Sequence, residues 1–476
     1  MQIFVIVASL LLLASLVGFI YYCIKGGNMI IGLFITATFW LLLGMTHTVW
    51  TQAAAGNIKS FTDGWNIIVG NINSIYSGGP IGYGTTTAVI IFASWFGRVI
   101  VDTGIAKSLI KKVVELSGDK QVVTVLTVSV VTALLFTSVF GPGSVMAFGA
   151  IVLPILLTIG VSKKLAVGSF LMAVAAGMYV NNGYIVQFSE HPLFKALFQD
   201  TIFTGNFTLF SWIAFGIHVL VMIGFILFSL YLSKDKIKAW SMSDDHLGGS
   251  DSEEDVPGYT FIVPFIPVLL SLIIVVINMI IGKDGTQLTQ FAAITSFVIG
   301  IFFGLLLTGN LKSYRKAVET TQKTLFNGIS DVALLIGMLL VLNMFSTAAS
   351  SLAAPIIQQA LGNSMNWVSN NPIIIVLIFI ALAPLALFRG PFMIWGSGIA
   401  LASVLAIFIP ATSPLLLVLF YVQPVGLVAQ SCPTQSWGMW SLSYTKYDAN
   451  EYIKTNLPWA WAITAINILV AFLILM

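Results

Sequence analysis

The residues with the most potential for chemistry lie at two matched interruptions of the apolar sequence. In the first half, Gly141-Pro142 interrupts one apolar run, and Gly177 opens a polar break further along. In the second half, Gly390-Pro391 and Gly426 repeat this pair with the same separation. Broken helices leave backbone groups unpaired at membrane depth, which is tolerated only where the break is buried in protein or lines a cavity. Paired interruptions in corresponding halves therefore predict the binding site of a secondary transporter.

Arg389, next to the second Gly-Pro, is the residue with the most specific chemistry. An arginine inside a membrane segment costs about 2.5–3.5 kcal/mol on the insertion scale and marks a functional site. Its planar guanidinium suits a carboxylate, which it binds through two hydrogen bonds. Two other roles stay open, because Arg389 can instead extend to the outer surface or pair with an acid. Arg98 lies one helical turn before Asp102, which predicts a structural ion pair.

Backbone and side-chain groups at the two tips and two breaks form the predicted site. Freed amides at the start of a half-helix attract an anion, and freed carbonyls at its end coordinate a cation. The predicted tips are Gly141, Pro142, Gly390 and Pro391. The predicted substrate-binding residues are Gly143, Ser144, Asn181, Asn182, Arg389, Gly390, Ser431, Thr434 and Gln435. The candidates for binding the coupling ion are Ser138, Asn181, Glu190, Gln430 and Asp102.

Two of these assignments have alternatives that the sequence leaves open. The amides and hydroxyls of the breaks can contact a ligand, or they can only cap the broken helix ends. Glu190 and His191 follow the first break, where they can carry a proton or lie in a loop beyond the membrane.

Composition predicts an integral membrane protein. Of 476 residues, 58% are hydrophobic and 8% are charged, whereas a soluble domain carries about 25% charged residues. The net charge of +3 gives no indication of a nucleic-acid partner. Cys23 and Cys432 offer neither a disulfide framework nor metal-ligand spacing, so we expect no metal and no cofactor. The chain has only four histidines and lacks His-Glu-x-x-His and Gly-x-Ser-x-Gly, so we expect no enzymatic activity.

Apolar runs predict an all-α polytopic membrane protein with about ten transmembrane helices and two re-entrant hairpins. The ten spans are expected near 3–24, 29–49, 82–102, 164–188, 207–232, 258–281, 289–309, 331–353, 413–437 and 456–476. The hairpins are expected at 120–160 and 372–411, each with Gly-Pro near its middle. We interpret 3–24 as a retained helix, because it lacks the basic start and cleavage site of a signal peptide.

Charge placement favours hairpins over pairs of spanning helices. With the N-terminus outside and both long runs returning to the side they left, most of the 21 basic residues become cytoplasmic. Only Lys59, Lys195 and Lys283 then lie in outside loops. This bias fits the positive-inside rule. It makes the two halves inverted repeats and places both termini outside.

The repeats divide the chain into five segments. Scaffold helices and an interfacial arm occupy 1–118 in the first repeat and 258–371 in the second. Transport parts occupy 119–232, with the broken helix 164–188, and 372–476, with the broken helix 413–437. The charged segment 233–257 is a predicted cytoplasmic linker.

The chain resembles the ion transporter superfamily, and within it the gluconate permease (GntP) family, with the citrate–metal symporters as relatives. The resembling stretches are Asp102-Thr103-Gly104-Ile105-Ala106, Trp437-Gly438, Tyr452-Ile453-Lys454-Thr455 and Pro458-Trp459-Ala460-Trp461. The resemblance implies a homodimer in the lipid bilayer. It also implies an elevator mechanism, in which 119–232 and 372–476 move against a scaffold of 1–118 and 258–362.

These observations predict a secondary active transporter of a prokaryotic inner membrane. It would couple the import of a small organic anion, such as a sugar acid or a hydroxy- or dicarboxylate, to a cation. H⁺ is favoured and Na⁺ is possible. The alternatives are a cation/proton antiporter of the same superfamily and, less favoured, a channel.

The topology is testable by labelling single cysteines from either side of the membrane. Lys112→Cys and Lys236→Cys should react only from inside, and Lys283→Cys only from outside, because the hairpins return to their own side. Labelling of positions 112 and 236 from opposite sides would contradict the hairpin assignment.

Overall fold

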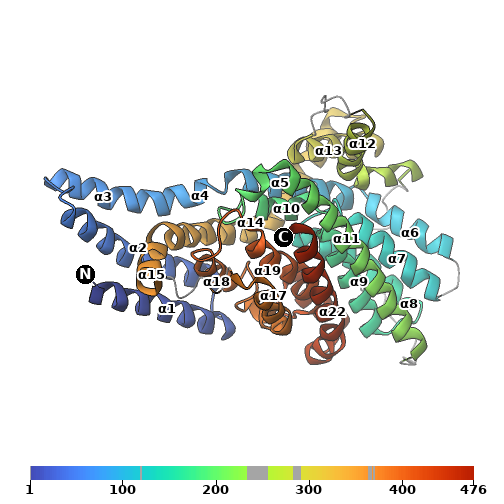
Figure 1. Cartoon of the computed structure of the whole chain (residues 1–476). Helices are drawn as coiled ribbons and strands as arrows, with labels where there is room; N and C mark the ends of the chain where they lie inside the picture. Colours follow the sequence, from blue (N-terminus) through green and yellow to red (C-terminus); the bar gives the residue numbers. More distant parts are fainter. Residues whose placement is uncertain (1, 118–120, 233–255, 282–290, 363–366, 368–369) are drawn as a thin grey trace.

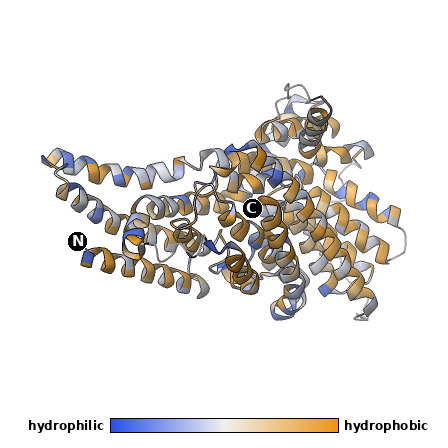
Figure 2. Ribbon diagram, viewed as in Figure 1, coloured by the Kyte–Doolittle hydropathy of each residue, from blue (hydrophilic) through white to orange (hydrophobic). Residues whose placement is uncertain are grey.

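The structure is a computed structural model that describes residues 2–117, 121–232, 256–281, 291–362, 367 and 370–476. Every regular element in the described part is helical, so the predicted all-α class is confirmed. Most of the predicted linker 233–257 lies outside the described residues. Apolar residues run along most helices, as expected for a chain surrounded by lipid (Figure 2).

The first repeat opens with long helices and a helical arm. Its elements are α1 (Gln2–Ile24), α2 (Met29–Ala54), α3 (Phe61–Asn73), the π-helical turn η1 (Ser74–Gly78), α4 (Gly79–Ile81), α5 (Gly84–Asp102) and α6 (Ile105–Ser117). α3 to α5 follow one another almost without interruption and form a 42-residue helical stretch. Figure 1 shows α1, α2, α3 and α15 at one end of the molecule and α7, α8, α9 and α11 at the other.

The first hairpin and broken helix follow the prediction closely. The elements are α7 (Gln121–Leu135), α8 (Pro142–Thr158), α9 (Lys163–Met178), α10 (Asn182–Ser189), η2 (Leu197–Gln199), α11 (Thr201–Leu227) and η3 (Phe228–Leu232). Gly141 has φ +107°, a value that side chains with a Cβ rarely adopt, and Pro142 then starts α8. α9 and α10 are bent by 53° across the predicted break.

The second repeat is less regular than the first. Its elements are η5 (Gly258–Phe265), α12 (Ile266–Ile281), α13 (Ala293–Leu307), α14 (Tyr314–Ala348), η7 (Ala349–Ala353), α15 (Ala354–Leu361), α17 (Pro372–Ala381), η9 (Ala383–Arg389), α18 (Gly398–Leu405), α19 (Leu415–Gln423), η10 (Pro424–Val428), α20 (Ala429–Ser431), α21 (Ser436–Thr445) and α22 (Ala449–Leu475). The hairpin arms are short, and its first arm bends by 59° between α17 and η9.

The second break lies slightly later than the sequence suggested. Gln430 and Ser431 remain helical in α20, and the chain leaves the helix at Cys432, whose φ of −89° and ψ of 118° are extended. The cause is Pro433, because the residue before a proline is driven out of the helical region.

The number of long spans is smaller than the ten expected. Within the described residues, seven helices are long and apolar enough to cross a bilayer, or nine if each bent pair counts as one span. Two of the expected spans, 258–281 and 289–309, correspond to η5 followed by α12 and to α13, and both border the residues 282–290 that lie outside the described ranges.

A close crossing of α5 and α14 forms the centre on which the first hairpin rests. A Cβ added to Gly328 of α14 would lie 2.8 Å from the backbone of Trp95 in α5. Ser94 Oγ donates to the Gly328 carbonyl at 2.9 Å. Gly97 of α5, one turn further along, lies directly against Ser144 and the Phe140 carbonyl. Small residues therefore let two helices and a hairpin tip meet at backbone contact. Whether the transport part moves over this surface stays a prediction.

Gly328→Ala should destabilise the protein, because its methyl group meets backbone that cannot move aside. Overpacking of this kind costs about 1–3 kcal/mol. Gly337→Ala is the matched control, since it lies on the same helix with nothing within 4 Å. The control should be neutral or stabilising by up to about 1 kcal/mol. Melting temperatures in detergent compare the two, and equal values would contradict the close crossing.

Candidate functional site

A cleft of about 490 Å³ lies where both tips, both breaks and α14 meet. Gly141 and Pro142 line it from the first tip, and Arg389 lines it from the second. Met178 and Gln435 belong to the first and second breaks. The four interruptions, although far apart in the chain, thus each contribute residues to one cleft.

Most of the cleft wall is apolar. The contributing side chains are mainly aromatic, branched or methionine: Met29, Phe136, Val139, Phe140, Val145, Met146, Val174, Met178, Leu334, Leu335, Met338, Met393, Trp395 and Trp437. Asp331 and Arg389 are the charged residues of this lining. A ligand would thus exchange water for apolar contact over most of its surface and meet charge at few points.

Arg389 faces the cleft without an acidic partner among the residues that the structure describes. Its Nη1 lies 3.8 Å from Met338 Sδ and 4.0 Å from Met29 Sδ, which are weak acceptors. Arg389 and the preceding Phe388 both have positive φ, +60° and +54°. Ser397 fixes this strained turn by donating its N–H and its Oγ–H to the Arg389 carbonyl, each at 2.9 Å. The backbone therefore holds an unneutralised cation at the cleft.

The starts of two helices also point to the cleft. α8 begins at Pro142 and α21 at Ser436, and neither has a side-chain cap from its N-cap residue. Free amides and the helix dipole make such ends attractive to negative charge. Phe388 N–H donates to Cys432 Sγ at 3.3 Å, which holds the second tip next to the break that precedes α21.

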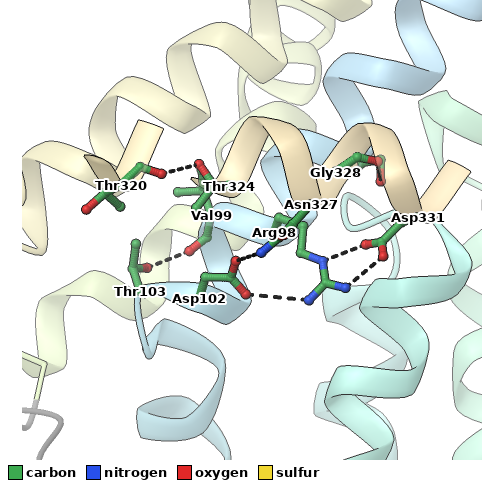
Figure 3. A network of polar contacts seen from close by, with 10 residues as sticks. Arg98, Val99, Asp102, Thr103, Thr320, Thr324, Asn327, Gly328 and Asp331 are labelled. Atoms are coloured by element: carbon green, nitrogen blue, oxygen red, sulfur yellow. Dashed lines mark hydrogen bonds and ion pairs between the residues drawn. The ribbon is translucent and has the colours of Figure 1, made fainter. Parts of the chain in front are cut away.

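Asp331 already occupies the start of α8. Gly143 lies so close to the Asp331 carboxyl group that a side chain would not fit between them. Arg98 donates to both Asp331 oxygens, from Nε at 2.6 Å and from Nη2 at 2.7 Å (Figure 3). Of the two helix starts, α21 is therefore the one left open to a ligand.

The same network holds Asp102. Arg98 Nη1 lies 3.5 Å from Asp102 Oδ1, and Asn327 donates to Asp102 Oδ2 at 3.0 Å (Figure 3). The expected pair of Arg98 and Asp102 is thus present, but Asp331 is the closer partner. Sequence reasoning missed Asp331. An acid at the start of an apolar run was the available signal, because such acids pair inside the membrane.

Among solved structures, the crystal structure of the Alcanivorax borkumensis YdaH transporter is similar to this chain. The two superpose with a TM-score of 0.58 over 92% of this chain and 98% of that one, at 13% identity. The chain has the fold of a membrane transporter. No protein-family model matches the sequence. No curated protein matches it either. The resemblance to gluconate permeases therefore stays a prediction.

Two adjacent asparagines of this transporter fold differ sharply in their contacts. Asn181 is fully buried and makes four hydrogen bonds. Its Nδ2 donates to the carbonyls of Phe136 and Val139, both at 2.9 Å. Its Oδ1 accepts from the amides of Gly183 at 2.8 Å and Tyr184 at 3.3 Å. Asn181 therefore ties the first break to the first tip and has no capacity left for a ligand. Asn182 is half-buried and makes no such bond with the described residues.

The remaining substrate candidates lie around the cleft rather than in its wall. Gly143 and Ser144 pack against Asp331 and α5, and Gly390 packs against the Leu385 carbonyl. Ser431 Oγ donates to the Leu427 carbonyl at 2.5 Å, and exposed Thr434 lies 3.1 Å from Cys432 Sγ. Of the predicted substrate residues, Arg389 and Gln435 line the cleft directly, together with the tip residues Gly141 and Pro142.

The coupling-ion candidates do not form one cluster. Glu190 pairs with Lys195 at 2.8 Å. The neighbouring His191 is fully buried, and its Nδ1 already accepts the Leu193 N–H at 3.1 Å. Ser138 Oγ is buried without a hydrogen-bond partner in the described part. Gln430 contacts His218, a histidine that sequence reasoning did not use.

Asn181→Ala should destabilise the protein, whereas Asn182→Ala should leave its melting temperature nearly unchanged. The first change leaves the buried carbonyls of Phe136 and Val139 without a donor and removes the N-cap side chain of α10. Each unpaired buried group costs about 1–3 kcal/mol. Melting curves of both variants test the difference. A strong effect of Asn182→Ala with none for Asn181→Ala would contradict the structural role.

Proposed function

We propose that the protein is a cation-coupled symporter of a small organic anion. The observation that carries this proposal is Arg389, held by a strained backbone in the cleft without an acidic partner in the described part of the chain. The uncapped start of α21 faces the same cleft, and Asp331 closes the other helix start. A carboxylate at this point would satisfy a guanidinium and helix amides together.

Symport by an elevator motion is supported by how the parts are joined. The first tip contacts α5 and α14 through glycine and serine, at Gly97, Gly141, Gly143 and Ser144. Such contacts carry few interlocking side chains, so one part can slide over the other. The proposal includes a homodimer, a prokaryotic inner membrane and both termini outside. A cation/proton antiporter is the second candidate, because the same cleft could bind a cation at Asp331.

Substitution of Arg389 tests the anion site. Arg389→Lys keeps the charge but loses the planar pair of donors, and Arg389→Ala loses both. Removing a charge-assisted hydrogen bond costs about 1.5–3 kcal/mol, a factor of roughly 10 to 150 in affinity. We expect weaker binding in Arg389→Lys and the weakest in Arg389→Ala. Thermal shift and calorimetry with gluconate, lactate, succinate and benzoate, with and without Na⁺, measure this.

Arg315→Lys is the control, since Arg315 is an exposed arginine outside the cleft. It should bind like the wild type. Wild-type affinity in well-folded Arg389→Ala would remove Arg389 from the site. Failure of all four acids to bind the wild type would overturn the organic-anion proposal.

A further inference from the structure

A second polar cluster lies behind the wall of the cleft. α9, α11, α22 and the π-helical turn η10 pack together around Gly426. Tyr179, His218, Thr464 and Asn467 are completely buried there. Each has a polar atom without a hydrogen-bond partner among the described residues: Tyr179 Oη, His218 Nδ1, Thr464 Oγ1 and Asn467 Oδ1. Buried polar atoms normally have hydrogen-bond partners, so four unpaired atoms in one region mark it as a candidate functional site.

Short distances join three of these groups, Tyr179, His218 and Thr464, around Gly426. A Cβ on Gly426 would lie 2.7 Å from Thr464 Oγ1 and 3.0 Å from Tyr179 Oη. The rings of Tyr179 and His218 meet edge-on, with centroids 5.7 Å apart. His218 Nε2 lies 3.0 Å from Gln430 Oε1. Glycine is therefore what leaves room in the centre, and π-helical turns such as η10 are frequent at functional sites.

The hydrogen bonds determine where a proton would bind. Gln430 Nε2 donates to the Gly426 carbonyl, so Gln430 Oε1 is the atom that faces His218. An oxygen there accepts a hydrogen bond, and His218 Nε2 must carry the hydrogen. The Nδ1 lone pair is then free, and the next proton goes to Nδ1.

His218 has no counter-charge in its surroundings. Tyr179 is the titratable group whose ring meets the imidazole, and Tyr421 lies on the far side of Tyr179, with ring centroids 6.4 Å apart. No aspartate, glutamate, lysine or arginine of the described part interacts with its imidazole. A buried imidazolium is costly in such a place, so His218 stays neutral until negative charge arrives nearby.

The negative charge would come from an anion bound in the cleft. Met178 lines the cleft, and Tyr179 of the cluster follows it directly at the end of α9. Pro424 also lines the cleft and lies two residues before Gly426 in η10. Two tyrosines connect the sites as well. Tyr184, in the cleft wall, donates to the Tyr421 carbonyl at 3.2 Å, and Tyr421 donates to the Tyr179 carbonyl at 2.9 Å. The two sites therefore share a wall.

We propose that His218 is the residue that carries the coupling proton, bound at Nδ1 in the buried cluster that also holds Tyr179, Thr464 and Asn467. The proposal rests on the anion symport proposed above. An anion beside Arg389 favours the imidazolium, and the imidazolium favours the anion by the same factor, because coupling between two sites is reciprocal. Both are then carried together and released together.

The pH dependence of anion binding tests this assignment. Dissociation constants of gluconate, lactate, benzoate and succinate are measured between pH 6.5 and 8.5, where the charge of each acid hardly changes. One linked proton makes binding up to about tenfold tighter for each unit of decreasing pH. His218→Gln should bind the same acid with no slope, and His191→Gln, a second buried histidine outside the cluster, should keep the wild-type slope.

Calorimetry of the wild type in two buffers of different ionisation enthalpy counts the proton without any variant. Uptake of about one proton per anion supports the proposal. Zero uptake, Na⁺-dependent binding without a pH slope, or a wild-type slope in folded His218→Gln overturns it while the anion site stands. Failure of every acid to bind at any pH overturns the anion site itself.

Discussion

The constraint on which the rest of the structure depends is that broken helices must satisfy their backbone groups inside a membrane. At the first break, one side chain does most of this: Asn181 caps α10 and donates to two carbonyls of the first tip. At the second break, Asn456 Nδ2 donates to the Gln430 carbonyl at 2.9 Å, and Trp437 Nε1 donates to the Ala429 carbonyl at 2.8 Å. With the ends fixed in this way, the amides that remain free can face a ligand. The position and chemistry of the cleft are therefore set by the backbone and side-chain groups that these contacts leave unpaired.

The fold could be anticipated in outline because its signals are local. Length and hydropathy indicate membrane helices, and Gly141-Pro142 marks a helix start that only glycine geometry allows. The second break shifted by a few residues, since Pro433 rather than Gly426 sets where the helix ends. The expected span 258–281 corresponds to η5 and α12 together, and α13 covers 293–307 of the expected 289–309.

The candidate site could be anticipated only in part, because contacts across distant segments leave no mark in a single sequence. Arg389 was recognisable as a charge in an apolar run, and it lines the cleft. Asn181 and Asn182 cannot be told apart by residue type. Only their contacts in the structure show that the side chain of Asn181 has all its hydrogen bonds made within the protein. Asp331 and His218 find their partners Arg98 and Gln430 more than two hundred positions away. Their roles depend on which atoms are left without partners after folding.

Charge balance explains why an anion and a proton suit this cleft together. Arg98 lies between Asp102 and Asp331, so the network at the first tip already carries excess negative charge and would repel a second anion there. Arg389, on the second tip, has no acidic partner among the described residues and would attract an anion to the start of α21. One anion at that point neutralises one arginine. A further positive charge can then be accommodated behind the cleft wall at His218. Its Nε2 donates to Gln430 Oε1, and its Nδ1 keeps a free lone pair. In the proposed function the two tips therefore differ: Asp331 of α14 closes the first, and a bound anion would complete the second.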